Sequence, residues 1–255
     1  MIHPTAIIDP QAELGSGVEI GPYSIIGKGV TVGEGTKIHN HVTLQGPTQI
    51  GKENEFFPYG SIGQQTQDLK YEGEPTHLEI GDHNLFREFV TLNRGTAPGS
   101  KTRIGSHSHF LAYTHIAHDC VIGDHCIFSN NSTLGGHVLV EDYVILGGFS
   151  GIHQFVRIGR HAMTGGVTKL VQDLPPYMIA DGNPALIRGI NQVGLQRRGF
   201  SEKAIKSLRT AYKTIYKKDL NVTQAIETMK AVEPPTEELS HLIDFVESSE
   251  RGIVR

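Results

Sequence analysis

An apolar residue returns at every sixth position through most of this chain. The first run contains Ile2, Ile8, Leu14, Ile20, Ile26, Val32, Ile38, Leu44, Ile50, Phe56 and Ile62. The same phase resumes at Ile80, Phe86, Leu92, Ile104, Phe110, Ile116, Ile122, Phe128, Leu134, Val140, Leu146, Ile152 and Ile158. A six-residue unit is too short for a pair of helices, but it suits a short strand followed by a corner. The sequence therefore predicts a mainly β protein, a parallel β-helix in which three units form one 18-residue coil.

Two segments interrupt the repeat, one near residues 64–78 and one near residues 95–102. Both are polar and contain glycine and proline, which is typical of loops. Long loops on a rigid scaffold commonly carry function, so the two segments are candidate parts of a site.

A different kind of sequence follows "LPPY" at 174–177, where two prolines oppose regular strand pairing. Apolar side chains are then spaced helically, and three residues are placed as helix N-caps: Ser201, Asn221 and Thr236. We expect the β-helix over residues 1–190 and a C-terminal α-helical domain over residues 191–255.

The net charge of −4 and the sequence pI near 6.4 provide no basic excess of the kind that binds nucleic acid. No apolar run reaches membrane-spanning length, and the start "MIHPTAIIDP" resembles no secretion signal. The two cysteines, Cys120 and Cys126, occupy inward positions and read as buried thiols. We therefore expect a cytoplasmic protein without an integral membrane segment.

One stretch departs from this average charge. Residues 191–220 contain eight Lys or Arg against two Asp or Glu. This patch predicts either a docking surface for an acidic partner or a solvated helix face.

The six-residue phase turns Ile116 and Cys120 inward, which places His115 and His118 on the outside or at a corner. Steps of 18 residues from His118 reach Gly136 and then Gln154, whose neighbours are His137 and His153. These residues form a predicted column along one edge, which offers a base, an unobstructed backbone N–H and polar orienting groups. The alternative is a set of exposed histidines without a function.

Asp119 follows His118 directly and has two interpretations. Its carboxylate can orient the imidazole, provided that the corner geometry turns both side chains the same way. Otherwise it is a hydrogen-bond acceptor for the corner backbone.

Five segments together resemble the bacterial UDP-N-acetylglucosamine acyltransferase family. They are "HIAHDC" at 115–120, "GGH" at 135–137, "HQF" at 153–155, "QDLKYEGEP" at 67–75 and "NQVGLQRRGFS" at 191–201. The resemblance implies a left-handed β-helix and a cytoplasmic homotrimer with active sites between adjacent prisms. It also implies transfer of a 3-hydroxyacyl chain from acyl carrier protein to the 3-position of UDP-N-acetylglucosamine, the first step of lipid A synthesis.

The resemblance implies a general base at His118 and an oxyanion-stabilising N–H at Gly136, with no metal or redox cofactor. Residues implied to contact the substrates are Asp68, Lys70, His115, His137, His153, Gln154, Asn191, Arg197 and Arg198. Among these, Asn191, Arg197 and Arg198 are implied to hold the nucleotide, because arginine forks suit phosphate. The matched position for acyl length is Gly166, where a glycine leaves room for a longer chain. The basic stretch 197–218 then has acyl carrier protein as its partner.

One position departs from the family pattern. Members that form an ester carry "HRGT", whereas this chain has "NRGT" at 93–96, so Asn93 replaces a histidine near the acceptor. Asparagine exchanges hydrogen bonds but cannot take the same charge. Either the acceptor is a 3-amino sugar nucleotide that becomes an amide, or the change is neutral.

Other transferases and other functions on this fold are the alternatives. Sugar N-acyltransferases and acetyl-CoA-dependent hexapeptide transferases differ in the loops and tail, so "QDLKYEGEP" and "QRRGFS" argue against them. A β-helical carbonic anhydrase needs an interfacial His₃ zinc site, but no two of the 14 histidines have its five-residue spacing. A non-catalytic β-helix that binds a sugar nucleotide predicts that His118→Ala leaves every property except local charge unchanged.

Overall fold

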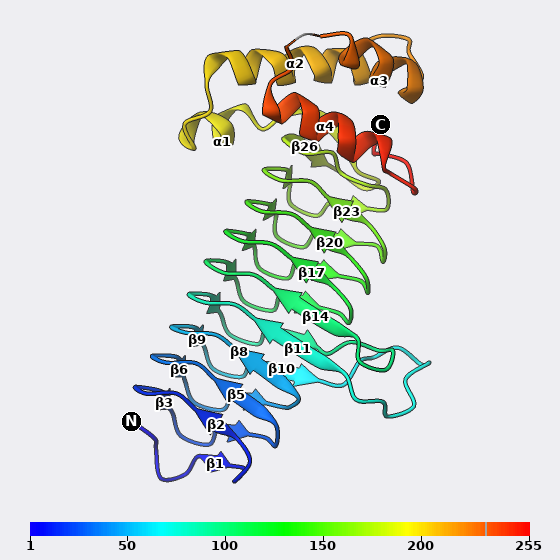
Figure 1. The fold of residues 1–255 in the computed structure, drawn as a ribbon. Coiled ribbons are helices and arrows are strands. Elements are labelled where there is room, and N and C mark those ends of the chain that lie inside the picture. Colours follow the sequence, from blue (N-terminus) through cyan, green and yellow to red (C-terminus); the bar gives the residue numbers. More distant parts are fainter. Residues whose placement is uncertain (233) are drawn as a thin grey trace.

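The computed structural model of the protein describes residues 1–232 and 234–255. The chain winds into a long three-sided prism with a group of helices at its C-terminal end (Figure 1). Each side is a sheet, and the 18-residue register is regular, as in Ile116↔Leu134 and Leu134↔Ile152. The predicted parallel β-helix is therefore confirmed.

The first sheet contains β1 (Ile7–Ile8), β4 (Ile25–Ile26), β7 (Thr43–Leu44), β10 (Ser61–Gln64), β13 (Thr91–Asn93), β16 (His115–Ile116), β19 (Thr133–Leu134), β22 (Gly151–Ile152) and β25 (Lys169–Leu170). The second contains β2 (Glu13–Leu14), β5 (Val30–Val32), β8 (Thr48–Ile50), β11 (His77–Ile80), β14 (Lys101–Ile104), β17 (Val121–Ile122), β20 (Leu139–Val140) and β23 (Arg157–Ile158). The third contains β3 (Glu19–Ile20), β6 (Lys37–Ile38), β9 (Glu55–Phe56), β12 (Leu85–Phe86), β15 (His109–Phe110), β18 (Ile127–Phe128), β21 (Ile145–Leu146), β24 (Met163–Thr164), β26 (Met178–Asp181) and β27 (Leu186–Ile190).

The apolar residues that recur at every sixth position fill the interior of the prism. Phe56, Phe86 and Phe110 stack with ring centroids 4.7 and 4.9 Å apart, and all three are buried. Cys120 and Cys126 are fully buried, as predicted. Burial of apolar area, at roughly 25 cal/mol per Å², is the main stabilising contribution in such a stack.

The three corners repeat a single backbone conformation. Corner 1 leads from the third sheet into the first, corner 2 from the first into the second, and corner 3 from the second into the third. One residue in most turns has a positive φ, for example Asp119 (59°), His137 (60°) and Phe155 (65°) along corner 2. This left-handed conformation is uncommon outside glycine, and here it recurs every six residues. The backbone conformation therefore sets the direction in which the side chain of each of these corner residues points.

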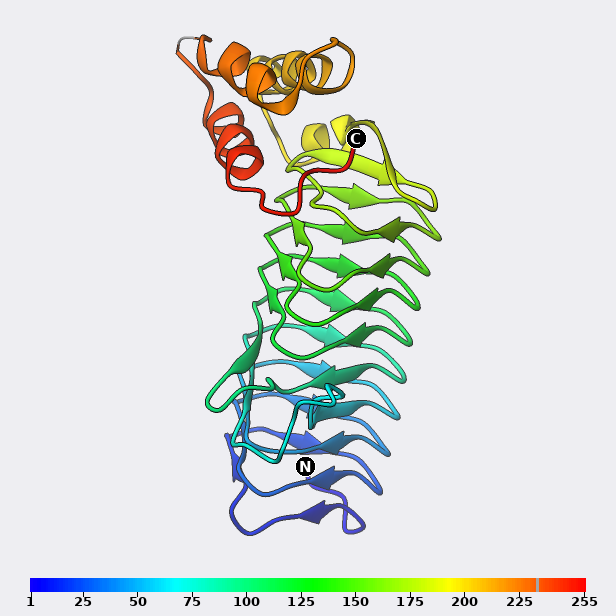
Figure 2. The same cartoon turned by 90° about the vertical axis from the view of Figure 1, so that its right-hand side faces the viewer.

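The two interruptions project from the prism as loops, facing the viewer in Figure 2. One joins β10 to β11 through residues 65–76, and the other joins β13 to β14 through residues 94–100. Both are slightly shorter than predicted because the flanking strands extend into their ends.

Four helices follow β27: α1 (Gln192–Arg197), α2 (Glu202–Tyr216), α3 (Val222–Lys230) and α4 (Glu237–Glu247). The predicted N-caps Ser201, Asn221 and Thr236 are confirmed, since each side chain accepts a backbone N–H of its own helix. In the described part of the chain, no helix has the length and apolarity needed to cross a membrane.

Candidate active site

His118 lies at corner 2, in the turn that follows β16. Its Nδ1 is 2.8 Å from Oδ2 of Asp119, so the ring donates this proton to the carboxylate and leaves Nε2 as an acceptor. The residue is only 9% exposed. The predicted corner position is correct, but the side chain is covered because the two loops fold over it.

The corner geometry turns the side chains of His118 and Asp119 toward each other. A φ of 59° at Asp119 turns its side chain back toward the preceding histidine. Its backbone N–H donates to Oγ1 of Thr102 at 2.8 Å, and its Oδ2 accepts the N–H of Thr96 at 3.1 Å. Although burial opposes ionisation, the hydrogen bond from His118, followed by smaller contributions that include the charge of His137, lowers the pKa of Asp119 below its ordinary value. The carboxylate is thus held ionised against the imidazole.

Asp68 approaches from the loop between β10 and β11. Its Oδ2 is 4.0 Å from Nε2 of His118, which is too long for a direct hydrogen bond. Two contacts fix the loop here, because the Asp68 N–H donates to Oγ1 of Thr66 and the Lys70 N–H donates to Oδ1 of Asp68. Oγ1 of Thr96 also donates to Oγ1 of Thr66 at 2.9 Å, which joins the two loops.

The layer above His118 contributes Gly136 and His137. Nε2 of His137 is 3.7 Å from Oδ2 of Asp119, and the two imidazole rings meet edge to face at 5.2 Å. A β-carbon on Gly136 would lie 2.4 Å from Cε1 of His118. Only glycine leaves space for the ring at this point.

His115 and Asn93 lie on the first sheet beside this corner. Nδ1 of His115 is 2.7 Å from Oγ1 of Thr91, and burial and then the charge of His118 lower the pKa of His115. Asn93 is buried and donates from Nδ2 to the carbonyl of Gln65, while its Oδ1 has no partner among the described residues. Together with Asp68 and Thr91, Asn93 lines an open cleft of about 490 Å³.

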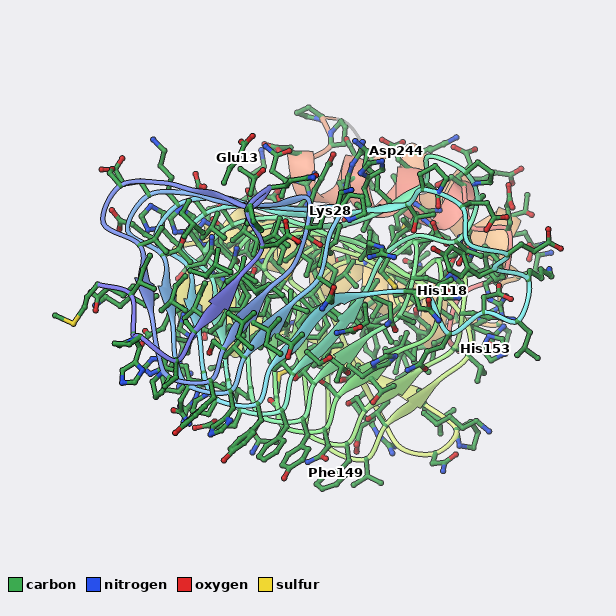
Figure 3. All side chains as sticks on the ribbon, turned by 90° about the horizontal axis from the view of Figure 1, so that it is seen from below. Glu13, Lys28, His118, Phe149, His153 and Asp244 are labelled. Atoms are coloured by element: carbon green, nitrogen blue, oxygen red, sulfur yellow. The ribbon has the colours of Figure 1, made fainter. Side chains whose placement is uncertain are left out.

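His153 and Gln154 lie two layers above His118 and are exposed. Figure 3 places His118 and His153 on the same edge of the prism, with Phe149 at another corner. Gly166 lies at corner 1, where a β-carbon would meet only the carbonyl oxygen of Gly148, at 3.6 Å. The structure therefore gathers Asp68, Asn93, His115, His118, Asp119, Gly136 and His137 closely, with His153 and Gln154 above them.

The expected nucleotide-binding residues lie elsewhere on the chain. Arg198 stacks over the Tyr143 ring at corner 3, with its guanidinium carbon 4.3 Å from the ring centroid. Asn191 is buried, caps α1, and donates to the carbonyl of His161. Arg197 is exposed at the end of α1. These three residues do not join the His118 group within a single chain.

Within the described residues, His118, Asp119 and His137 form a group with three ligand atoms less than 4.8 Å apart. Two imidazoles and a carboxylate are suitable donors for a transition metal. Nδ1 of His118 is hydrogen-bonded to Asp119, whereas its Nε2 is free to accept a proton or to bind a ligand. The expectation of a metal-free site stays a prediction.

Sequence reasoning missed the threonines that hold the site. Thr96 and Thr102 fix Asp119 from the second loop and the layer below, at 23 and 17 residues' distance along the chain. Thr96 belongs to the "NRGT" segment, which indicates that it lies near the acceptor. The segment does not indicate that Thr96 contacts Asp119.

A stack of six-residue units, each a short strand and a corner, with a His–Asp pair at one corner defines a hexapeptide-repeat transferase. A family model described as bacterial transferase hexapeptide matches residues 101–136. A second, described as UDP N-acetylglucosamine O-acyltransferase, domain 2, matches residues 173–254. The chain belongs to the UDP-N-acetylglucosamine O-acyltransferase family, and its fold is the left-handed parallel β-helix.

Full-length relatives support this assignment. The acyl-[acyl-carrier-protein]–UDP-N-acetylglucosamine O-acyltransferase of Janthinobacterium sp. (strain Marseille) is 50% identical, over 100% of this chain and 99% of the relative. The structure of LpxA from Acinetobacter baumannii is 52% identical over 100% of this chain and 99% of that chain, with a TM-score of 0.96. A UDP-N-acetylglucosamine acyltransferase from Bacteroides fragilis is 40% identical over the whole of both chains, with a TM-score of 0.98.

Proposed function

We propose that this chain transfers a 3-hydroxyacyl group from acyl carrier protein to the 3-hydroxyl of UDP-N-acetylglucosamine, the first step of lipid A synthesis. The names of its full-length relatives support the reaction class. The observation that carries the mechanism is the His118–Asp119 hydrogen bond of 2.8 Å beneath Gly136.

In this mechanism, Nε2 of His118 accepts the proton of the sugar hydroxyl as its oxygen attacks the thioester carbonyl. A C–O bond forms, and the carbonyl oxygen becomes a tetrahedral oxyanion. The Gly136 N–H, which has no backbone partner among the described residues, is available to stabilise this charge. Collapse breaks the C–S bond, and the imidazolium protonates the leaving thiolate. Asp119 stabilises that imidazolium.

The proposed steps use no redox agent or metal, and the absence of a cofactor is part of the proposal. The acyl donor arrives on the phosphopantetheine arm of the carrier protein. The two free, buried cysteines suit a reducing cytoplasm.

The acceptor contact is proposed for Asn93. Its buried Oδ1 has no hydrogen-bond partner among the described residues. Buried polar atoms are normally hydrogen bonded, so this oxygen is available to accept a hydrogen bond from a substrate. A sugar hydroxyl or amine can donate to it. The relatives are named O-acyltransferases, so the proposed product is the ester.

A homotrimer is proposed because the single chain leaves the site incomplete. The His118 group lies at corner 2, whereas Arg198 lies at corner 3. A neighbouring copy can bring its corner 3 residues against corner 2, so that Asn191, Arg197 and Arg198 reach the nucleotide. Corner 1 also exposes a column of large side chains, namely Tyr23, Tyr59, Phe89, Tyr113 and Phe149. A column of exposed aromatic side chains is typical of a contact surface.

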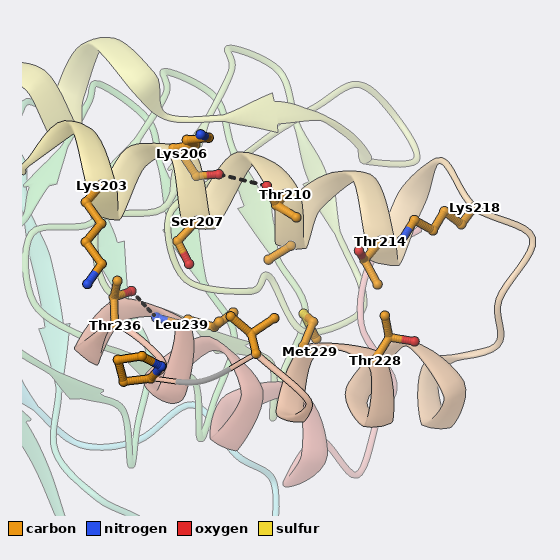
Figure 4. A pocket seen from close by; sticks show the side chains of 13 residues that line it. Lys203, Lys206, Ser207, Thr210, Thr214, Lys218, Thr228, Met229, Thr236 and Leu239 are labelled. Carbon is orange, nitrogen blue, oxygen red and sulfur yellow. Dashed lines mark hydrogen bonds between the residues drawn. The ribbon is translucent and has the colours of Figure 1, made fainter.

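The acyl carrier protein is proposed to dock on the helical domain. Lys203, Lys206 and Lys218 line a mostly apolar hollow of about 300 Å³ between α2, α3 and α4 (Figure 4). Apolar floors rimmed by ammonium groups suit an acidic, amphipathic partner helix. Acyl carrier proteins carry such an acidic surface.

The decisive test is the activity of His118→Ala. The purified variant is incubated with 3-hydroxyacyl carrier protein and UDP-N-acetylglucosamine, and the products are identified by mass spectrometry. We expect turnover to fall by roughly 10²–10⁴-fold with the fold and oligomeric state unchanged. His109→Ala, which removes an exposed histidine from the third sheet, is the matched control. Equal turnover by His118→Ala and the unsubstituted protein would favour the binding-module alternative.

A further inference from the structure

The chain end returns from α4 to the top of the prism. Figure 2 shows this red segment crossing the uppermost coils. Ile253 forms a parallel bridge with Asp173, and the Asp173 N–H donates to the carbonyl of Gly252 at 3.0 Å. The C-terminal segment therefore extends the second sheet next to corner 2, which is the corner of His118.

Anchors on both sides hold this segment in place. Oγ of Ser249 donates to Oδ2 of Asp173 at 2.7 Å, and Ile253 and Val254 are buried. Arg255 donates to carbonyl groups at the end of α2 and beyond it. The backbone of Arg251, between these anchors, has a fixed position.

The side chain of Arg251 points to the column of candidate site residues. Its Nη2 is 3.3 Å from Nδ1 of His153 and 3.3 Å from the carbonyl oxygen of Val171. His153 also lies 3.0 Å from the carbonyl oxygen of Gln154 through the same Nδ1. A neutral ring that donates to this carbonyl cannot also accept from Arg251, so the arginine has one firm partner, a backbone oxygen.

The guanidinium carries a charge without a local counterpart. Arg251 is exposed, and within the described residues no carboxylate forms an ion pair with it. The nearest buried acid, Asp173, already accepts from Ser249 and from the N–H of Arg157. An unpaired guanidinium on the edge of the prism that carries His118 and His153 is suited to a bidentate contact with phosphate.

The position along the prism fits a phosphate of a substrate held at His118. Gln154 lies two layers above His118, and Arg251 reaches the level of His153 and Val171. Strand layers are spaced by about 4.8 Å, so this level is roughly 10–15 Å above the proposed base. Both proposed substrates carry a phosphate some distance from the reacting atoms.

We propose that Arg251 is a phosphate-binding residue at corner 2, above His118. It contacts either the diphosphate of the nucleotide sugar or the phosphodiester of the carrier arm. The inference rests on the proposed function, since it takes its two ligands from that reaction. It adds a cation from the C-terminal segment of the subunit that supplies His118.

The test compares Arg251→Gln and Arg251→Lys with the unsubstituted protein. The KM of each substrate is measured in turn at saturating concentration of the other. We expect KM for one or both substrates to rise about tenfold in Arg251→Gln, with kcat nearly unchanged and partial recovery in Arg251→Lys. Arg103→Gln is the matched control, because it removes an exposed arginine from the outer face of the second sheet.

The substrate whose KM rises identifies the source of the phosphate. Unchanged KM values for both substrates in Arg251→Gln would overturn the proposal. Calorimetric titration of the full-length protein with UDP, and separately with 4′-phosphopantetheine, tests the contact without turnover. If the unsubstituted protein proved inactive, the proposed function would fail, and weaker binding by Arg251→Gln would still support a phosphate site. If Arg251→Gln bound both compounds as tightly as the unsubstituted protein does, the proposed phosphate site at Arg251 would be wrong.

Discussion

The α-carbon of Gly136 faces the imidazole of His118 so closely that a β-carbon there would lie 2.4 Å from Cε1 and 2.5 Å from Nε2. Real β-carbons do not approach a ring this closely, so one of the two groups must move. Since Asp119 holds Nδ1 at 2.8 Å, any movement of the ring strains or breaks this hydrogen bond.

Gly136→Ala is therefore expected to reduce kcat/KM at least 100-fold, because the base and its carboxylate separate. Steady-state kinetics with both substrates measure this effect, and circular dichroism checks the fold. The control is Gly60→Ala, where an added β-carbon meets its neighbours at ordinary contact distances of 3.6 Å or more. Full activity of Gly136→Ala would mean that the ring position is not critical.

Asp119→Asn tests the ionised carboxylate. An amide nitrogen facing Nδ1 favours the wrong tautomer, in which Nε2 carries the proton and cannot act as a base. We expect kcat to fall by at least 100-fold with little change in KM. Asp124→Asn serves as the comparison, since Asp124 also accepts a backbone N–H, that of Ser106, at corner 3. A loss in both variants would point to general damage of the corners instead.

Gly166→Met tests the proposed limit on acyl length. The open space around Gly166, with only the Gly148 carbonyl oxygen at 3.6 Å, accommodates a side chain without disturbing the backbone. We expect unchanged thermal stability and a preference shifted toward shorter 3-hydroxyacyl chains by about 10-fold or more in relative kcat/KM. Competition between carrier proteins loaded with different chains measures the shift. An unaltered preference would place the end of the groove elsewhere.

His161 gives a prediction for stability against pH. Burial, followed by the charge of Arg198, lowers the pKa of His161 to about 4 from 6.5. Between these values the unfolded chain binds a proton that the folded chain does not. The free energy of unfolding therefore decreases as pH falls from 6.5 toward 4, by up to about 3 kcal/mol from this group.

His161→Phe should remove this contribution while keeping the stack with Tyr143, whose ring centroid is 4.7 Å away. Urea unfolding at several pH values measures the difference between the variant and the unsubstituted protein. His107→Phe makes the same change in an exposed layer of the same corner. If the stability difference between His161→Phe and the unsubstituted protein did not vary with pH, burial of the neutral ring would not be the cause.

The sequence and the structure agree most closely where a short-range rule acts repeatedly. The inward residues, such as Ile116 and Cys120, follow from the period of six, and the cap at Ser201 follows from local hydrogen bonding. The alignment of His118 with Gly136 required only the addition of 18 residues, because each coil stacks in register.

Contacts that leave the repeat were not accessible in the same way. The burial of His118 depends on two loops whose paths have no period, and the partner of Thr96 lies 23 residues away. Likewise, Arg251 meets His153 across 98 residues, through a segment that the pattern places only as the end of a helical domain. Such contacts arise from the packing of particular side chains, which hydrophobic periodicity does not encode.

The pairing of Ile253 with Asp173 has a consequence for assembly. A β-helix layer that ended in open N–H and C=O groups would offer a template for the first strand of another molecule, and stacks of prisms could polymerise into filaments. Here the returning chain end pairs with the upper layer of the second sheet, while β27 lies antiparallel on β26 in the third. The C-terminal segment and β27 thus act as a cap, which prevents further molecules from adding to this end of the prism.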